Sequence, residues 1–294
     1  MSLLARCFAL CVLFVVAACS DDARQRKAMV ATANTHASDA AAAILAKGGS
    51  ATDAAITAQL VLTLTEPQSS GIGGGLFMLH YAVNDASITT FDGRENAPLD
   101  ADETLFLKPD GKPLAWPDAA LGGKPVGTPG VISALWKAHQ KFGRLEWASL
   151  FEPAIRLAEQ GFAVSPRLHA AIADANHLDT DDAAAAIYFL GDGDYGEPDV
   201  AVPVGHLLKN QPYADTLKLI AANGSDGFYK GPVAQAIVDA VRSNEVNPGL
   251  MTLADLSAYE AIERQAVCAP YRAYRVCGMG PPTSGGLTSL MILG

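Results

Sequence analysis

The chain has 294 residues, half of them apolar, and its 31 acidic and 21 basic side chains give a formal net charge of −10. A chain of this length and composition can bury a sizeable core, which favours a folded globular protein over a disordered one. The acidic excess repels a phosphate backbone, and no basic stripe offsets it, so nucleic-acid binding is disfavoured. No linker rich in glycine, serine or proline divides the chain, so we expect one domain.

The first 19 residues predict an export signal. Arg6 precedes an apolar run over 7–16, and small residues follow before Cys19. The run is shorter than the roughly 20 apolar residues that a spanning helix needs. Because the ending resembles a bacterial lipobox, we expect Cys19 to be lipidated, with ordinary cleavage nearby or an uncleaved anchor as alternatives. Residues 20–28 are then a polar tether, and the body is exported to the periplasm or anchored at its membrane.

Two cysteines, Cys268 and Cys277, lie outside the predicted signal. They flank the run 269–272, which can turn between two strands and bring the pair together in an oxidising compartment. Two separate buried thiols are the alternative. Two cysteines without a nearby histidine cluster make a poor metal site.

The body begins with a short predicted strand at 29–33, followed by two helices rich in small residues. The first helix covers 36–47 and ends at a glycine pair. Ser50 caps the second helix, which has Asp53 in its first turn and ends at the Glu-Pro pair 66–67. This pattern predicts two helices packed closely against a sheet.

A glycine-rich loop at 69–75 leads into two predicted strands, 76–83 and 87–92, joined by a turn at 84–85. No Gly-Lys-Ser/Thr follows this loop, and phosphate-binding loops lead into a helix, so nucleotide binding is disfavoured. Close approach of the backbone is the better account, since glycine permits contacts that a β-carbon blocks.

Arg94 stands where the second of these strands ends, beside the glycine-rich loop. A guanidinium in this place can bind a carboxylate ligand through two parallel hydrogen bonds. From spacing alone the stronger interpretation is a local ion pair, because Asp92 and Glu95 are both at hand.

Helical periodicity dominates the middle of the chain. Thr128 and Pro129 predict the cap and first residue of a helix that ends at Gly143. Further helices are predicted at 147–159, 166–175, 213–222 and 232–243, and strands at 259–266 and 274–279. A loop at 281–286 precedes the apolar run 287–293, which predicts the start of a buried helix. Because that run has no stop signal, we expect the native chain to be longer.

Seven motifs taken in order resemble those of one protein family. They are GGSATDAA at 48–55, EPQSSGIGGG at 66–75, DGRE at 92–95, GTPG at 127–130, FEPAIRLA at 151–158, TLADL at 252–256 and PPTSGG at 281–286. From about Met29 to its last residue, the chain resembles the large-subunit region of the γ-glutamyltransferase family. The resemblance therefore divides the chain into a signal at 1–19, a tether at 20–28 and an incomplete large-subunit region at 29–294.

The resemblance implies an α+β fold, the αββα sandwich of N-terminal nucleophile hydrolases, of which this chain holds the large-subunit portion. Members of the family are made as one precursor that cuts itself into a large and a small subunit. The cut exposes a threonine that attacks the γ-glutamyl carbonyl, with its own α-amine as base. Water or an acceptor amino acid or peptide then resolves the intermediate, and no metal or organic cofactor takes part.

Carried over residue by residue, the resemblance assigns the grip on the substrate α-carboxylate to Arg94 and an orienting role to Glu95. It places the catalytic threonine downstream, so no residue of this chain is expected to be catalytic and the chain alone is expected to be inactive. Neither Thr35 nor Thr283 matches the nucleophile. The expected partners are a γ-glutamyl substrate such as glutathione or its conjugates, and the protein's own small subunit.

Two alternatives remain open at this stage. Relatives of the same fold hydrolyse other amides, among them cephalosporin side chains and poly-γ-glutamate. The chain could also be a catalytically dead lipoprotein that binds γ-glutamyl compounds. The second alternative is disfavoured, because half of a two-subunit sandwich would leave apolar sheet edges exposed.

Overall fold

The computed structural model describes residues 28–175, 178–191 and 200–294, and the chain divides into one unit that ends at Ala31 and another that begins at Thr32. The predicted export signal, with Cys19, lies outside the described residues, as does the tether up to residue 27. Residues 28–32 form no regular structure, so the strand predicted at 29–33 is wrong. A strand needs a partner for its backbone groups, and no described strand pairs with this segment. No helix in the described ranges is long and apolar enough to span a membrane.

The first two helices follow the prediction closely. Helix α2 covers Thr35–Ala46, and helix α3 covers Ala51–Thr65. Ser50 and Asp53 form a reciprocal capping box at the start of α3, because each side chain accepts a hydrogen bond from the backbone N–H of the other.

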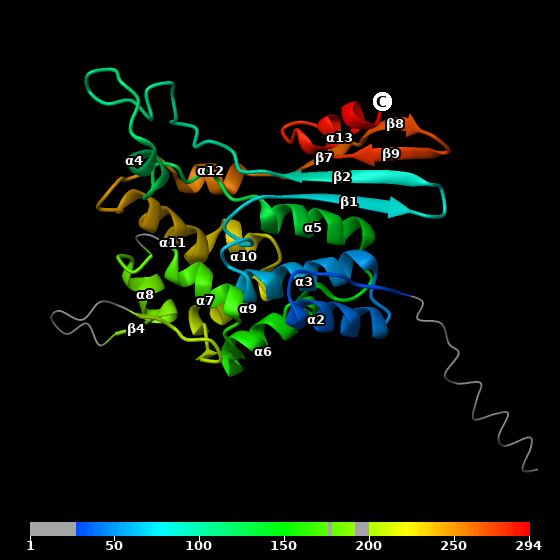
Figure 1. The fold of residues 1–294 in the computed structure, drawn as a ribbon, viewed down its shortest axis with the longest axis horizontal. Helices are drawn as coiled ribbons and strands as arrows, with labels where there is room; N and C mark the ends of the chain where they lie inside the picture. Colours follow the sequence, from blue (N-terminus) through cyan, green and yellow to red (C-terminus); the bar gives the residue numbers. More distant parts are fainter. Residues whose placement is uncertain (1–27, 176–177, 192–199) are drawn as a thin grey trace, which may run out of the picture. The chain divides into compact units, whose positions relative to one another are not determined.

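The strand that leads to Arg94 belongs to a three-stranded antiparallel sheet (Figure 1). Its strands are β1 (Leu76–Ala82), β2 (Ser87–Gly93) and β7 (Ile262–Gln265), with β2 in the centre. The hairpin of β1 and β2 confirms the two strands predicted there. The register pairs Leu76 with Gly93 and Asp92 with Ile262. The end of β2 therefore lies between the glycine-rich loop and a segment far along the chain.

Helix α5 (Val131–Phe142) packs against β1 and β2, and the fully buried Phe91 shares one apolar core with Ala134 and Ala138 of this helix. The helix begins later than predicted, with Gly130 at its N-cap. The reason is that Thr128 exchanges two backbone hydrogen bonds with Asn96, which holds Thr128 in a β-bridge and outside the helix.

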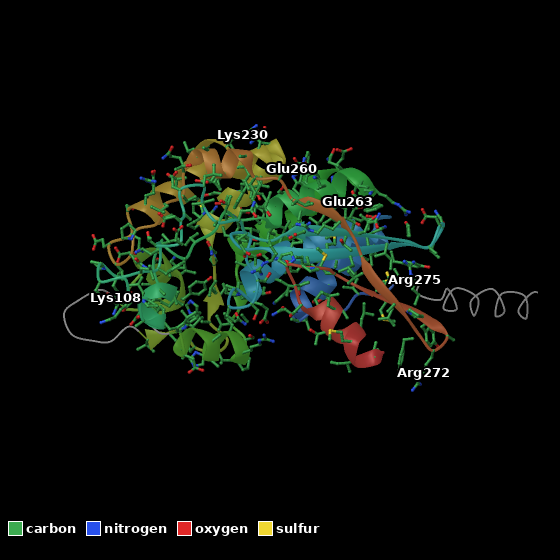
Figure 2. All side chains as sticks on the ribbon, turned by 90° about the horizontal axis from the view of Figure 1, so that it is seen from above. Lys108, Lys230, Glu260, Glu263, Arg272 and Arg275 are labelled. Carbon is green, nitrogen blue, oxygen red and sulfur yellow. A yellow bond between two sulfur atoms is a disulfide. The ribbon has the colours of Figure 1, made fainter. Side chains whose placement is uncertain are left out.

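Two ion pairs join α5 to β7 and to the segment just before it. Lys137 contacts Glu260 at 2.7 Å, and Lys141 pairs with Glu263 one turn further along the helix. Figure 2 labels both glutamates, of which Glu263 lies in β7 and Glu260 lies two residues before the strand begins. Exposed pairs of this kind contribute little to stability, but they record the register of β7 against the helix.

The remaining helices before the second hairpin lie in the rest of the chain, and some of them surround a second apolar core that includes Leu168, Leu208 and Ala214. They are α4 (Trp116–Ala120), η1 (Trp147–Leu150), α6 (Glu152–Gln160), α7 (Pro166–Ala173), α8 (Asp182–Tyr188), α9 (Gln211–Asn223), α10 (Asp226–Tyr229), α11 (Gly231–Arg242) and α12 (Leu253–Ala258). Short strands connect some of them, with β3 (Phe162–Ala163) on β6 (Leu207–Leu208) and β4 (Phe189–Leu190) on β5 (Val200–Ala201). The helices predicted at 166–175, 213–222 and 232–243 are confirmed, whereas the one predicted at 147–159 is divided into η1 and α6. The strand predicted from residue 259 begins at Ile262, because the chain is still leaving α12 at Tyr259.

A second hairpin of β8 (Val267–Tyr271) and β9 (Tyr274–Gly278) follows, and helix α13 (Gly285–Leu293) packs on it. Hairpin and helix lie on the side of the three-stranded sheet opposite α5 (Figure 1). The order helix, sheet, hairpin and helix matches the predicted αββα arrangement. The helix predicted at 287–293 is confirmed but its burial is not, because no side chain of α13 is buried among the described residues.

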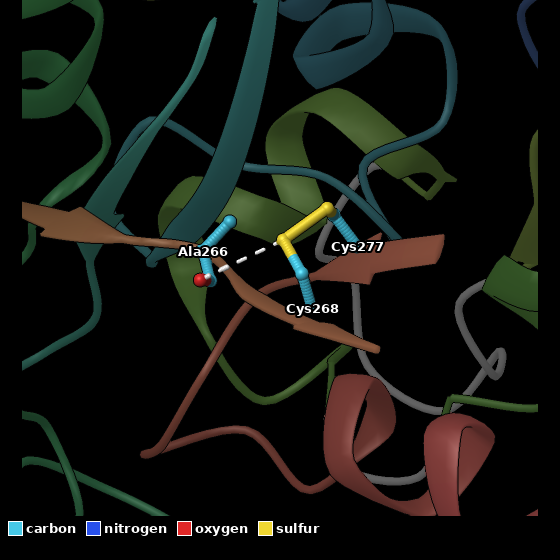
Figure 3. Close-up of a disulfide and its surroundings, with 3 residues drawn as sticks. All are labelled: Ala266, Cys268 and Cys277. Atoms are coloured by element: carbon cyan, nitrogen blue, oxygen red, sulfur yellow. Dashed lines mark hydrogen bonds between the residues drawn. A yellow bond between two sulfur atoms is a disulfide. The ribbon is translucent and has the colours of Figure 1, made fainter. Parts of the chain in front are cut away.

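Cys268 and Cys277 face each other across this hairpin and form a disulfide (Figure 3). Their α-carbons are 4.1 Å apart, which is the short separation of a pair that exchanges no ladder hydrogen bonds. Of the two alternatives drawn from the sequence, pairing is therefore the one that the fold adopts.

We expect Cys268 and Cys277 to resist alkylation in the unfolded protein unless a reductant is added first. The reason is that a disulfide sulfur is not a nucleophile, whereas a free thiolate is. Mass spectrometry of the peptide that contains both cysteines measures the outcome. Alkylation of Cys268 and Cys277 without reductant would contradict the disulfide.

Candidate functional site

A cavity of about 460 Å³ opens where β2 ends. Its walls come from residues 92–96, residues 259–264 and the pair Pro281 and Pro282. The register of the sheet explains this composition, since β7 lies beside β2 and carries residues 262–265 to the same edge. The cavity therefore joins two of the family motifs, those at 92–95 and 281–286, with the segment 259–264, although the three are far apart in the sequence.

Arg94 supplies an accessible guanidinium to this cavity. Its side chain is half exposed, its Nε lies 3.1 Å from Oε2 of Glu95, and its guanidinium carbon lies 5.9 Å from the centre of the Phe77 ring. Within the described ranges, no hydrogen bond is made by its two terminal amino groups. The local ion pair expected from spacing is present, yet the outer edge of the fork remains available to a carboxylate.

Asp92 does not compete for this guanidinium. The carboxylate is buried, and it accepts a hydrogen bond from the backbone N–H of Arg94 at 3.0 Å and another from Nε of Arg264 at 2.7 Å. Arg264 thus balances the charge of Asp92 and leaves the side chain of Arg94 to other partners. Sequence reasoning missed Arg264, because it becomes a neighbour of Asp92 only when β7 pairs with β2.

The side chain of Glu95 fills space that is open only because its neighbours are glycines. A β-carbon at Gly75 would come within 2.8 Å of the Glu95 carboxyl group, and one at Gly127 within 2.9 Å of its Cβ. The carbonyl of Gly74 accepts hydrogen bonds from Gly130 N at 2.9 Å and from the first residue of α5. The glycine-rich loop therefore acts as expected, by close approach of its backbone.

Tyr259 approaches Arg94 from the segment between α12 and β7. Its phenol donates a hydrogen bond of 2.6 Å to the Arg94 carbonyl, and its ring stacks almost parallel on Tyr229 at 5.7 Å. Burial raises the pKa of Tyr259 to about 12, with the charges of Asp92 and Glu95 adding to the effect. The phenol therefore keeps its proton at neutral pH. No local signal in the sequence pointed to this residue.

The cavity can bind a small carboxylate, but the described residues do not equip it for nucleophilic attack. No serine, threonine or cysteine of the described part lines it, and neither Thr35 nor Thr283 does so. Among the described residues no three His, Cys, Asp or Glu side chains gather as a metal site. Cys19, the predicted lipidation site, lies outside these residues.

The layers of helix, sheet, hairpin and helix are those of an α+β protein of the N-terminal nucleophile hydrolase class, large-subunit part. A crystal structure of gamma-glutamyltranspeptidase from Helicobacter pylori has the same fold, with a TM-score of 0.85 and 30% identity over 92% of this chain and 74% of that one. The family model Gamma-glutamyltranspeptidase matches residues 37–294. This chain belongs to the gamma-glutamyltranspeptidase family.

Two curated relatives show the range of this family. The glutathione hydrolase proenzyme of Bacillus subtilis (strain 168) is 37% identical over 265 residues, which are 90% of this chain and 43% of that protein. The acylase ACY 1 proenzyme of Pseudomonas sp. (strain SE83) is also 37% identical, over 89% of this chain and 46% of that protein. This chain thus spans less than half the length of either relative.

Proposed function

We propose that this chain is the large-subunit part of a γ-glutamyltransferase, or glutathione hydrolase, precursor. The whole enzyme cleaves γ-glutamyl amide bonds and passes the γ-glutamyl group to water, an amino acid or a peptide. The observation that carries this proposal is the open guanidinium edge of Arg94 in a cavity of a chain of this family. The nucleophile is a threonine outside this chain, freed when the precursor cuts itself, in keeping with the word proenzyme in the names of the relatives.

Arg94 binds the α-carboxylate of the γ-glutamyl group. A planar carboxylate accepts two parallel hydrogen bonds from the guanidinium, which sets the direction as well as the position of the bound group. Glu95 pairs with Nε of Arg94, and Arg264 pairs with Asp92. The outer edge of the Arg94 guanidinium is therefore left to face the ligand. Because the glutamyl side chain separates the bound carboxylate from the scissile carbonyl, this grip fixes where the carbonyl meets the nucleophile.

The proposed partners are glutathione or its conjugates and the protein's own small subunit. The N-terminal signal exports the protein, and lipidation at Cys19 anchors it at the periplasmic face of a membrane. No metal or organic cofactor is required for acyl transfer by a threonine whose own α-amine is the base.

Replacing Arg94 by alanine in the full-length precursor is expected to raise KM for a γ-glutamyl anilide at least about tenfold, the factor that a charge-assisted hydrogen bond is worth. Arg94→Lys is expected to recover only part of the loss, because an ammonium has no fork. Initial-rate kinetics measure both effects. Arg156→Ala is the matched control, since Arg156 is exposed on α6 and outside the cavity.

The same assay separates this proposal from an acylase activity of the kind named for one relative. A donor whose α-carboxylate is replaced by a carboxamide loses the partner of Arg94, so the wild type is expected to discriminate strongly against it. An enzyme that accepts both donors equally, or an Arg94→Ala variant with unchanged KM, would contradict the proposed role of Arg94.

A further inference from the structure

The backbone at Arg94 is held by side chains instead of by a sheet ladder. Strand β2 ends at Gly93, so the peptide groups of Arg94 have left the regular pairing with β1. Asp92 accepts a hydrogen bond from the Arg94 N–H at 3.0 Å, and the Tyr259 phenol donates one of 2.6 Å to the Arg94 carbonyl. These two contacts supply the partners that the ladder no longer provides.

Tyr259 is itself placed by rigid elements. Helix α12 starts with a reciprocal capping box of Thr252 and Asp255 and ends directly before Tyr259. On its other side the ring of Tyr259 stacks on Tyr229, whose phenol is buried and donates to the carbonyl of Pro129 at 2.7 Å. The phenol oxygen of Tyr259 is therefore held from a helix end and from a second aromatic ring.

The backbone at Gly93 and the start of α5 at Gly130 pass each other closely, with Tyr259 beside them and no space for a further atom. A β-carbon at Gly130 would collide with the Tyr259 phenol oxygen and with the carbonyl of Gly93. Gly93 is equally confined, because its own β-carbon would come within 2.7 Å of the Ala134 side chain and 2.9 Å of the Gly130 carbonyl. A shift of the Arg94 backbone toward α5 is thus blocked sterically, and the hydrogen bond from Tyr259 opposes a shift away from it.

We propose that Tyr259 is a positioning residue for substrate binding, whose phenol holds the backbone of Arg94 so that the guanidinium edge faces the α-carboxylate of the γ-glutamyl group. The inference rests on the proposed role of Arg94. Tyr259 acts through the hydrogen bond to the Arg94 carbonyl, and its phenol is the donor because a carbonyl oxygen only accepts.

The test compares Tyr259→Phe with Tyr213→Phe in the full-length precursor. Tyr213 is a matched control, because its buried phenol also donates to a backbone carbonyl, that of Leu60 at 2.8 Å, and it does not line the cavity. Tyr259→Phe is expected to raise KM for the γ-glutamyl anilide about threefold to tenfold, the range for one hydrogen bond, with kcat within about twofold. Tyr213→Phe is expected to leave KM unchanged.

A double variant shows whether Tyr259 acts through Arg94. In the Arg94→Ala background, Tyr259→Phe is expected to have no further effect on KM, because the side chain that it positions is gone. An equal rise of KM in both backgrounds would overturn the inference, as would an equal rise for the α-carboxamide donor. Both results would mean that the phenol acts without the guanidinium.

The two proposals fail in different ways. If Arg94→Ala raises KM and Tyr259→Phe does not, the positioning role of Tyr259 is overturned and the role of Arg94 stands. If Arg94→Ala leaves KM unchanged, the proposed ligand role of Arg94 is overturned and the positioning role falls with it. A rise in both single variants without additivity in the double variant supports both.

Discussion

Replacement of Asp53 by alanine is expected to lower the free energy of unfolding by about 4 kcal/mol, since one buried and two part-buried N–H groups lose their acceptor at about 1 to 3 kcal/mol each. The Asp53 side chain is fully buried. Its Oδ2 accepts hydrogen bonds from the backbone N–H groups of Ser50 at 2.8 Å, Arg144 at 3.0 Å and Leu145 at 3.2 Å. One carboxylate therefore joins the start of α3 to the loop that follows α5.

Urea-induced unfolding of the purified protein measures this loss. Asp53→Asn is expected to cost only about 1 kcal/mol, because the amide keeps an acceptor oxygen in place of Oδ2. Its nitrogen takes the place of Oδ1, which has no hydrogen-bond partner among the described residues. Asp39→Ala, at an exposed position on α2, is the surface control and is expected to change stability by less than about 0.5 kcal/mol. Equal losses in the two Asp53 variants would contradict this account.

Replacement of Gly130 by alanine is expected to cost about 3 kcal/mol, the upper end for overpacking a filled site. The backbone angles of Gly130, φ −117° and ψ −10°, are open to alanine, so the cost arises from contacts. The added methyl group meets the phenol oxygen of Tyr259 and the carbonyl of Gly93. Relief requires the end of β2 to move away from α5.

Gly73→Ala is the matched control for this substitution. A β-carbon at Gly73 meets no atom within 4 Å, so its urea midpoint is expected to stay close to that of the wild type. Adding Tyr259→Phe to Gly130→Ala removes one of the two colliding oxygens and is expected to restore part of the loss. If Gly130→Ala unfolds at the wild-type midpoint, the close crossing of these segments is wrong.

The elements that the sequence predicted well are those with local signals. The capping box of Ser50 and Asp53 spans one helical turn, and the hairpin of β1 and β2 follows from two alternating runs around a short turn. The start of α5 was predicted too early, because the backbone of Thr128 forms a β-bridge with Asn96, which is distant in the sequence. The strand predicted at 29–33 failed because a strand is stable only with a partner.

The residues of the site were likewise predicted only where the signal is local in the sequence. Arg94 was identified because it stands at a strand end within a family motif, and both facts can be read along the chain. No such signal in the sequence pointed to Tyr259 or Arg264, since their importance lies in contacts with Arg94 and Asp92. The pairing of Cys268 with Cys277 was one of two alternatives until the register of β8 and β9 decided it.

The amino-acid sequence by itself determined the family, the order of most helices and strands, and Arg94 as the candidate ligand residue. Caps, turns and apolar periodicity act within a few residues, so they can be recognised without knowing the fold. Only the tertiary structure decided that Asp92 is balanced by Arg264 and that Tyr259 holds the Arg94 backbone. Those contacts form when β7 pairs with β2, and the pairing of distant strands depends on the packing of the whole sheet and its helices.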